Sequence, residues 1–367
     1  MHERNYYKIG DLINPLPKKY KKAKPVAKSC YVKVASRVDT FLCNHHYFVN
    51  PPKVQVYPVN SINFVIDKFS EALVEINNQE TIEVHELAGR EPIIIHTALI
   101  MKKTLGFKEG ITISAKNLHS IEHGGLGSSA SLQTAVALAI NQLFGNKIGN
   151  EDLIRLLAQN YGEESDRDGY LTSMASIGGA SAAGLLSSDA IIIGGENEIW
   201  AQGNLPEEYK VIVAIPEIEK LPDGMLDMAL FEKGFEMFKK IGNDWGKIKE
   251  KILQEQIIPE FNKNNLAPLF ESINFYTIGA YGDIPSYFKN RWSNHSLFMD
   301  EFIHTFYSNL FSQLSQKKSC FFVSSGGPAM IFITRETKAV RKMLQAAGIK
   351  TIIESNLHST GPVIELR

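Results

Sequence analysis

A glycine-rich turn between a strand-like and a helix-like segment constrains this chain more than any other feature. Residues 121–131 read Ile-Glu-His-Gly-Gly-Leu-Gly-Ser-Ser-Ala-Ser. Residues 111–115 before the turn alternate apolar and polar side chains, as a half-buried strand does, and apolar residues recur after it at helical spacing. We therefore expect a strand, a tight turn, and a helix that begins near Ser128 and ends at Gly145-Asn146.

A turn of this kind can bind phosphate. Its glycines allow positive φ and a close approach of the backbone to a ligand, and the first amides of the helix are unpaired donors at the positive end of the helix dipole. A bound phosphate would satisfy those amides. An ordinary strand-to-helix turn capped by Ser128 or Ser129 is the structural alternative. The turn lacks the Gly-Lys-Ser/Thr ending of a Walker loop and the acidic partner of a dinucleotide-binding fingerprint.

Composition allows a soluble enzyme but does not select one. The 367 residues are 44% hydrophobic and carry a net charge of −1, so we expect two closely joined domains, a cytoplasmic location and no nucleic-acid partner. The sequence contains no run of about 18 apolar residues, so no membrane-spanning helix is predicted. Cys30, Cys43 and Cys320 lack metal-ligand spacing and are predicted to be free, buried thiols. We expect a small-molecule substrate, and a homodimer is possible.

The chain is predicted to have three parts. Residues 1–28 form an extended arm in which prolines bracket the lysine-rich run 18–24, residues 29–200 form a first domain, and residues 201–367 form a second. The basic run is typical of a solvated segment, with contact to an anionic ligand or a second subunit as the alternative. Expected strands cover 31–35, 54–59, 62–66, 111–115, 190–193, 209–216, 320–323, 329–334 and 350–353, with helices at 92–105, 152–161 and 336–347. The order of the last elements predicts an α+β layer of split β-α-β character.

Three segments together resemble the GHMP kinase superfamily, which includes galactokinase, homoserine kinase and mevalonate kinase. Residues 125–130, Gly-Leu-Gly-Ser-Ser-Ala, resemble its phosphate loop, and residues 324–329, Ser-Ser-Gly-Gly-Pro-Ala, resemble the turn that closes over the phosphates. Residues 35–47 match the N-terminal motif in part, because Asp39 replaces an asparagine and Cys43-Asn44 stands where acidic residues are usual. The resemblance implies an α+β, two-domain GHMP fold, with an N-terminal domain like ribosomal protein S5 domain 2, a ferredoxin-like C-terminal domain and an active site between them.

The resemblance also implies ATP-dependent phosphorylation of a small metabolite with Mg²⁺. Arg37, Asp39 and Ser129 would be catalytic, with Arg37 neutralising the transferred group, although a solvated arginine at a strand end is the alternative. The metal would be held by Ser129 with Glu163 or Glu164, which are assigned by position alone. The substrate would meet Tyr47, Asp168, Thr172 and Ser173. The phosphates and nucleotide would be bound by His123, Gly124, Gly125, Leu126, Gly127, Ser128, Ser129, Ala130, Ser324, Ser325, Gly326 and Gly327.

One departure from the kinase pattern leaves the reaction open. Residues 172–179 carry no carboxylate where superfamily kinases usually place a general-base aspartate, and Asp166 and Asp168 lie just upstream. Together with the turns at 122–128 and 324–328, this resembles the branch of beta-ribofuranosylaminobenzene 5'-phosphate synthase. That enzyme condenses phosphoribosyl diphosphate with 4-hydroxybenzoate and releases diphosphate and carbon dioxide. Ser129-Ala130-Ser131 instead follows the kinases, and a catalytically silent ligand-binding protein is a third possibility.

Overall fold

The fold is given by a computed structural model of the chain. It describes residues 6–20, 22–43, 60–87, 90–118, 125–165, 167–173, 178–215, 243, 245–278, 318–324 and 329–367. The predicted strand at 54–59 and most of residues 216–317 lie outside the described residues. The described elements form an α+β fold with three sheets, as the sequence predicts.

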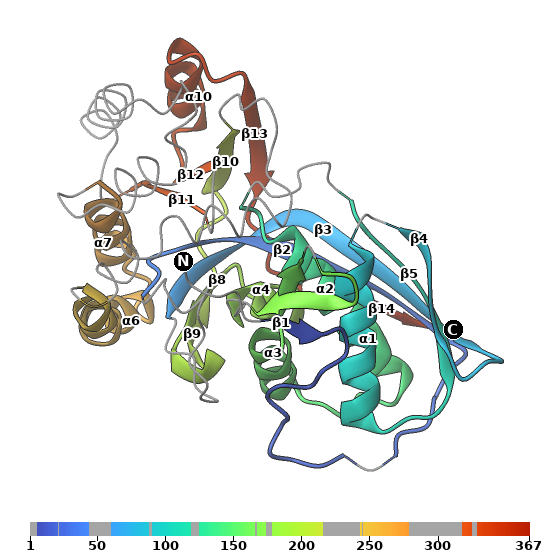
Figure 1. Cartoon of the computed structure of the whole chain (residues 1–367). Helices are drawn as coiled ribbons and strands as arrows, with labels where there is room; N and C mark the ends of the chain where they lie inside the picture. Colours follow the sequence, from blue (N-terminus) through green and yellow to red (C-terminus); the bar gives the residue numbers. More distant parts are fainter. Residues whose placement is uncertain are drawn as a thin grey trace.

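Two long antiparallel strands dominate the first domain. They are β2 (Ser29–Thr40) and β3 (Ser61–Asn77), which arch across the molecule in Figure 1. The first part of β3 pairs with β8 (Ala190–Ile193) and its second part with β5 (Gly110–Asn117). This sheet also contains β4 (Ile82–Leu87), parallel to β5, and β9 (Ile199–Gly203), antiparallel to β8.

Four helices gather on one side of these strands (Figure 1). They are α1 (Glu91–Leu105), α2 (Ser128–Leu143), α3 (Asn150–Gln159) and α4 (Gly178–Leu185). The sequence predicts all of these helices except α4. A Cβ at Gly184 would lie 2.9 Å from Thr134 Cγ2, so this glycine lets α4 approach α2.

A second, antiparallel sheet has the order β11 (Cys320–Val323), β12 (Met330–Thr334), β10 (Lys210–Ile215) and β13 (Thr351–Asn356). β10 lies between two partners in the sheet, and residues 211–215 are all buried, with Val211, Val213 and Ile215 in a hydrophobic core. The amphipathic helix α10 (Thr337–Ala346) buries Val340 and Leu344 and contacts β10, while α7 (Ala267–Ile278) contacts β11. Shorter helical turns are η2 (Gly195–Asn197), the π-helical η3 (Leu253–Ile257) and α6 (Ile258–Phe261).

The two sheets have separate cores that meet where β2 and β3 end. The first core lies between the long strands and helices α1 to α4. The second combines Val38 and Phe64, from β2 and β3, with side chains of β10, β11 and α7. Phe64 stacks on Phe322 with ring centroids 5.9 Å apart. Leu126 of the glycine-rich turn is buried in this second core, which anchors the turn at the junction of the cores.

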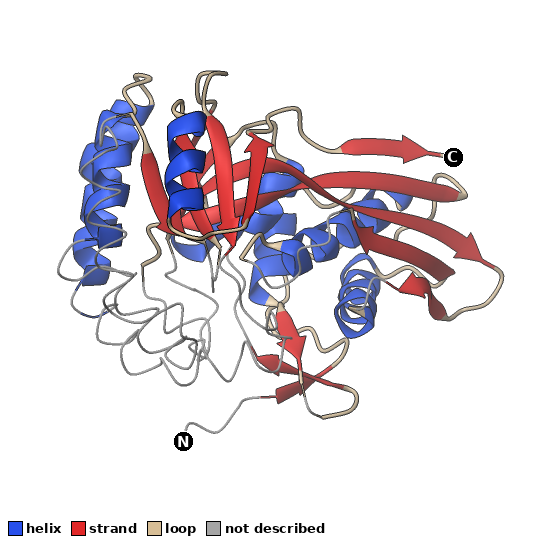
Figure 2. Ribbon diagram, turned by 90° about the horizontal axis from the view of Figure 1, so that it is seen from above, coloured by secondary structure: helices blue, strands red, loops and turns tan. Residues whose placement is uncertain are grey.

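The domain boundary at residue 200 stays a prediction, and strand pairing joins segments on both sides of it. The last strand, β14 (Val363–Leu366), pairs with β2 in the first sheet, and Figure 2 shows it running along the edge of the long strands. β9 also extends the first sheet to Gly203. Antiparallel pairing depends on what a strand meets in space, so the chain position of β14 does not reveal its sheet.

The N-terminal arm packs on the first domain. Residues Tyr6–Lys8 form β1, which pairs with β7 (Tyr170–Ser173), and β7 pairs in turn with β6 (Gly162–Glu164). The Gly10 amide donates to His96 Nδ1 at 2.9 Å, and Leu16 and Ala23 are buried. The described lysines of the basic run are exposed, as predicted, while the backbone around them is held in place.

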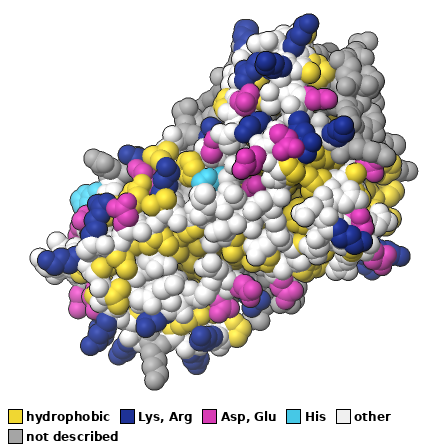
Figure 3. Space-filling view, turned by 180° about the vertical axis from the view of Figure 1, so that it is seen from behind, with side chains coloured by type: hydrophobic (Ala, Val, Ile, Leu, Met, Phe, Trp, Pro, Cys, Tyr) yellow, Lys and Arg dark blue, Asp and Glu magenta, His cyan; other side chains and the backbone are white. Residues whose placement is uncertain are grey.

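Other predictions concern thiols, charge and membranes. Cys30, Cys43 and Cys320 are free and buried, as predicted, and burial raises the pKa of Cys30 to about 11. On the face shown in Figure 3, basic and acidic side chains are interspersed. None of the helices in the described part of the chain is long and apolar enough to span a bilayer.

Candidate functional site

A buried ion pair lies at the end of β2. Arg37 Nη1 is 2.7 Å from Asp39 Oδ1, and both side chains are almost completely excluded from solvent. Arg37 and Asp39 are two residues apart on the strand, so their side chains point to the same face of the sheet. The burial of Arg37, which is 4% exposed, rules out the solvated strand-end alternative. Pairing with Asp39 offsets the cost of burying the guanidinium and orients it.

Ser324 connects this ion pair to the glycine-rich turn. Its hydroxyl oxygen accepts the backbone N–H of Asp39 at 3.0 Å and lies 3.2 Å from Asp39 Oδ1. The same hydroxyl is hydrogen-bonded to the carbonyl oxygen of Gly125. A hydroxyl has one proton, so Ser324 donates to one of these two acceptors at a time. Ser324 follows β11, and its contacts bring the three segments singled out in the sequence into one network.

The turn itself packs on the guanidinium. Gly125 and Gly127 have φ values of 84° and 68°, which favour glycine. A Cβ on Gly127 would lie 3.1 Å from Arg37 Nη1, so glycine also permits close approach. Gly127 is the N-cap of α2, and no side chain caps the helix there. The serine cap considered from the sequence is therefore absent, and the first amides of α2 keep the capacity to bind an anion.

Hydroxyl groups hold the first turn of α2 against the sheet. Ser131 Oγ lies 3.0 Å from Ser36 Oγ on β2 and 2.7 Å from Ser70 Oγ on β3. It also contacts the Ser128 carbonyl oxygen at 3.0 Å. Ser36, Ser70 and Ser131 are at most 1% exposed. Buried polar groups with satisfied hydrogen bonds resist displacement, so this network fixes the helix start below the turn.

On its other side, the helix start contacts a second buried ion pair. Ala130, in the first turn of α2, packs with Tyr161 and Ala180 in a small buried cluster. Tyr161 donates to Glu163 Oε1, and Arg90 Nη2 binds Glu163 Oε2. Burial raises the pKa of Tyr161 well above its usual 10, and the Glu163 charge adds to this effect.

The segment that contains the glycine-rich turn matches a known family model. Residues 92–177 match the model described as GHMP kinases N terminal domain. This match spans α1, the glycine-rich turn, α2 and the β6–β7 pair, and so includes Ser129, Tyr161 and Glu163. No curated protein matches the chain significantly in sequence.

Solved structures extend this likeness to the whole fold. Homoserine kinase from Cytophaga hutchinsonii is 16% identical with a TM-score of 0.58, and covers 93% of this chain and 99% of its own. A mevalonate diphosphate decarboxylase from Enterococcus faecalis is 12% identical with a TM-score of 0.62, over 93% and 100% of the two chains. A structure of MDDEF in complex with MVAPP, AMPPCP and magnesium has the same scores and coverage. At these identities the likeness establishes the GHMP fold.

Magnesium does not fit Glu163 in this domain. One carboxylate oxygen binds the Arg90 guanidinium and the other accepts the Tyr161 proton, so a metal ion there would lie beside a buried positive charge. Glu164 Oε1 is also 3.6 Å from Arg90 Nε. Among the described residues, no three His, Cys, Asp or Glu side chains are grouped to hold a metal. Ser129 is different, because its hydroxyl oxygen has lone pairs that suit a hard cation.

The expected substrate residues fall in different places. Thr172 is buried on β7, directly opposite Glu163 in the β6–β7 pair. Ser173 ends β7, and Asp168 is exposed in the turn between the two strands. Thr172 therefore lies next to the buried ion pair, whereas Asp168 faces solvent. The expected residues Tyr47, His123, Gly124, Ser325, Gly326 and Gly327 lie outside the described part of the chain.

Sequence reasoning missed Tyr161 and Arg90. Arg90 precedes α1, and its contact with Glu163 spans 73 residues. Their only local signals are weak ones: an arginine before a helix with proline in its first turn, and a tyrosine directly after a helix. Neither Tyr161 nor Arg90 belongs to a recognisable sequence motif. Arg90 and Glu163 come together only because α1 packs against β6.

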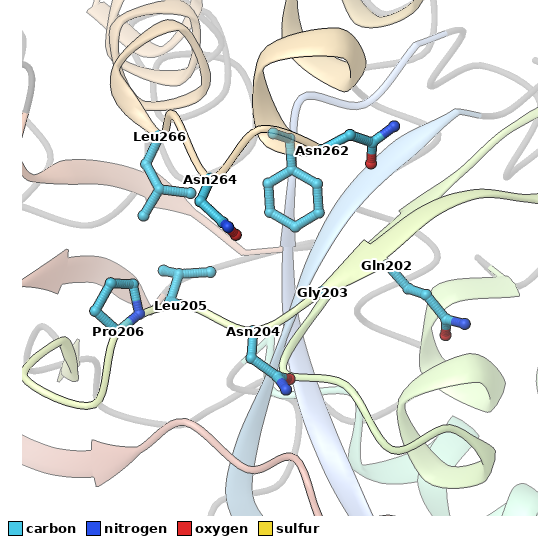
Figure 4. Close-up of a pocket in the computed structure, with 9 residues that line it drawn as sticks. Gln202, Gly203, Asn204, Leu205, Pro206, Asn262, Asn264 and Leu266 are labelled. Atoms are coloured by element: carbon cyan, nitrogen blue, oxygen red, sulfur yellow. The ribbon is translucent and has the colours of Figure 1, made fainter.

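A separate pocket of about 310 Å³ lies between the end of β9 and the loop from α6 to α7 (Figure 4). Its polar side chains are uncharged amides, from Gln202, Asn204, Asn262 and Asn264. Behind it, Asp189 Oδ1 accepts the Leu205 amide at 2.8 Å, and burial raises the pKa of Asp189 to about 6. None of the phosphate-site residues lines this pocket.

Asp189→Asn is expected to raise the melting temperature at pH 7.5. The folded-state pKa of Asp189 lies above its unfolded value near 3.9, so its contribution favours folding below about pH 4 and is lost as the pH rises through 6. Two pKa units correspond to about 2–3 kcal/mol. Asparagine keeps the acceptor for Leu205 without the charge, so the gain should shrink at pH 4.5. Thermal unfolding at both pH values checks this, with Asp189→Ala, which loses the acceptor, as a destabilised control. A lower melting temperature for the asparagine variant at pH 7.5 would contradict it.

Proposed function

We propose that this protein is an ATP-dependent phosphotransferase of GHMP type that acts on a small metabolite. The observation that carries the proposal is the network of Arg37, Ser324 and the turn at 125–127. It joins segments up to 285 residues apart in the chain, each of which resembles a motif of this superfamily.

The local chemistry of this network suits a polyphosphate. Positive-φ glycines and the uncapped start of α2 present backbone N–H groups at the positive end of a helix dipole. Arg37 adds a positive charge held against the same turn. Preorganised donors and charges of this kind stabilise the charge that develops when a phosphoryl group is transferred.

The reaction proposed here proceeds without a general base in the segment where superfamily kinases usually have one. The sequence from Gly169 to Ser188 contains no Asp or Glu. A general base contributes about 10²–10⁴-fold, whereas phosphoryl transfer depends mainly on positioning and on charge neutralisation. The buried Arg37 and the rigid helix start are the groups we assign to that work.

Acceptor candidates come from structural relatives. One relative is a homoserine kinase and another is a mevalonate diphosphate decarboxylase, crystallised also with MVAPP, AMPPCP and magnesium. Homoserine, mevalonate diphosphate and related small hydroxy acids are therefore the first acceptors to test. Phosphoribosyl diphosphate with an aromatic acid is the competing donor and acceptor pair, because a diphosphate would fit the same turn.

Incubation with ATP, Mg²⁺ and these acceptors is expected to release ADP and a phosphorylated or decarboxylated product. A parallel assay measures diphosphate released from phosphoribosyl diphosphate and 4-hydroxybenzoate. Thermal shift with each donor supplies the binding readout, since a ligand at 100 times its Kd adds about 2.7 kcal/mol of stability. Diphosphate release alone would favour the synthase, and binding of a donor without turnover would favour a silent member of the fold.

A further inference from the structure

Two buried side chains of the first domain hold the N-terminal arm. His96 on α1 accepts the backbone N–H of Gly10 at its Nδ1, which is 2.9 Å away. Asn160, directly after α3, accepts the backbone N–H groups of Ile13 and Asn14 at 2.8 and 2.9 Å. The Asn160 amide also donates to the Asn14 carbonyl oxygen at 2.9 Å. His96 and Asn160 are 1% and 0% exposed, and neither has a role in the proposed function.

The contacts of His96 determine where its proton lies. Nδ1 accepts the Gly10 N–H and so carries no proton, and the Nε2 proton is donated to the Asn160 carbonyl oxygen at 2.7 Å. Both hydrogen bonds therefore require a neutral imidazole. A second proton, on Nδ1, would point at the Gly10 N–H, and two donors cannot form one hydrogen bond. Protonation of His96 is thus incompatible with the docked position of Gly10.

The surroundings of His96 favour the neutral ring. Burial lowers its pKa below the usual 6.5, and this effect outweighs a backbone hydrogen bond and the charge of Asp11 in the arm, which both raise it. Lys103, on the same helix, adds a positive charge that lowers the pKa, and it donates to the Gly10 carbonyl oxygen at 2.6 Å. The Tyr7 ring, also in the arm, covers the imidazole at 5.4 Å between centroids. Undocking of the arm exposes His96 to solvent, where its pKa returns toward 6.5.

The arm supports a small sheet beside the candidate site. β1 pairs with β7 and β7 pairs with β6, so β7 is the central strand of three. Without β1 the sheet would be a two-stranded hairpin, which is marginally stable at best in water. Glu163 lies on β6 and Thr172 on β7, and Tyr6 of β1 lies directly opposite Thr172. The docked arm therefore stabilises the strands that carry both residues.

We propose that residues 6–16 of the arm are a strap that protonation of His96 releases, and that this release loosens the β6–β7 hairpin beside the candidate site. Undocked His96 binds a proton near pH 6.5, whereas docked His96 binds one only at lower pH. Docking is therefore at full strength above about pH 6.5. It weakens as the pH falls below that value, by up to about tenfold per pH unit. The strap does not depend on which reaction the site performs.

The test measures amide hydrogen exchange of the full-length protein at pH 7.5 and pH 5.0 by mass spectrometry, with rates corrected for the intrinsic effect of pH. In the wild type, protection of residues 6–16 should fall about tenfold or more at pH 5.0. Protection of β6 and β7 should fall with it. The central strand segment 111–115 of β5 should keep its protection, which shows that the first domain stays folded.

Two substitutions of His96 separate its proton from its packing. His96→Asn keeps a neutral acceptor near the position of Nδ1, so its arm should stay protected at pH 5.0. His96→Gln places its amide near the position of Nε2 and loses the acceptor for Gly10, so its arm should exchange rapidly at both pH values. His358→Asn is the matched control, because His358 also has a pKa lowered by burial but packs on Phe69. This control should lose arm protection at pH 5.0 as the wild type does.

Three results would contradict the proposal. Equal arm protection at both pH values in the wild type would overturn the strap. A His96→Asn protein that still loses arm protection at pH 5.0 would assign the effect to another group. Arm release with unchanged protection of β6 and β7 would overturn the loosening of the hairpin. If His96→Asn does not fold, nitrogen NMR of the labelled wild-type histidines decides instead: His96 must carry its proton on Nε2, and its titration must coincide with the loss of arm protection.

Discussion

Gly127→Asp is expected to weaken nucleotide binding at least 100-fold. The new carboxylate would lie at the uncapped start of α2, where the proposed phosphate binds, and would repel it. Its Cβ would also lie 3.1 Å from Arg37 Nη1. The backbone φ of 68° at this position is one that residues other than glycine rarely adopt. Titration calorimetry with AMPPCP and Mg²⁺ measures the effect.

Two control variants separate charge from geometry in this experiment. Gly127→Asn has nearly the same size and tolerates positive φ, so it should lose less affinity than the aspartate. Gly149→Asp introduces the same carboxylate at the N-cap of α3, where φ is −69° and no atom lies within 4 Å of the added Cβ. That control should bind normally and melt no lower than wild type, since aspartate is a favourable N-cap. Unchanged affinity in Gly127→Asp would remove the phosphate assignment of the turn.

Arg37→Ala is expected to lower both turnover and stability. Turnover should fall at least 100-fold, because a preorganised charge next to the transferred group contributes several kcal/mol to the transition state. Stability should fall by about 3–5 kcal/mol, because Asp39 would stay buried without its counter-charge. A surface arginine would show neither effect, since exposed ion pairs contribute under about 1 kcal/mol.

A double variant separates the two losses. Arg37→Met with Asp39→Asn removes both charges, and the asparagine oxygen still accepts a hydrogen bond from Ser324. Urea unfolding should show most of the stability restored, because replacing both partners of a buried pair is often nearly neutral. Turnover measured on the same preparation should stay low. If the double variant retained more than a tenth of wild-type kcat/KM, Arg37 would contribute less than about 1.4 kcal/mol to catalysis.

Local sequence patterns predicted most of the regular structure. Helical spacing of apolar residues gave the correct position of α2, and the continuous apolar run at 211–215 indicated the central strand β10. Both signals arise from burial of a face whose period is visible within a dozen residues. The glycines at 125 and 127 were informative for the same reason, since their backbone conformation is set locally.

The candidate site could be predicted only as separate segments. Resemblance to one family suggested that Arg37, the turn and Ser324 belong together. The structure adds their contacts: the Ser324 hydroxyl is hydrogen-bonded to Asp39 and Gly125, and Gly127 allows the turn to pack closely on Arg37. It also replaces a guessed metal carboxylate by an ion pair, since nothing in the sequence connects Arg90 to Glu163.

The sequence by itself determined helices α1, α2, α3 and α10, the inner strands of the two larger sheets and the glycine-rich turn, because propensity, periodicity and glycine geometry act over neighbouring residues. Only the tertiary structure decided that β14 returns to the first sheet, that the N-terminal arm pairs with β7, and that Arg90 pairs with Glu163. Each of these contacts joins residues far apart in the chain. Such contacts form when two buried surfaces complement each other in space, a property that no local pattern records.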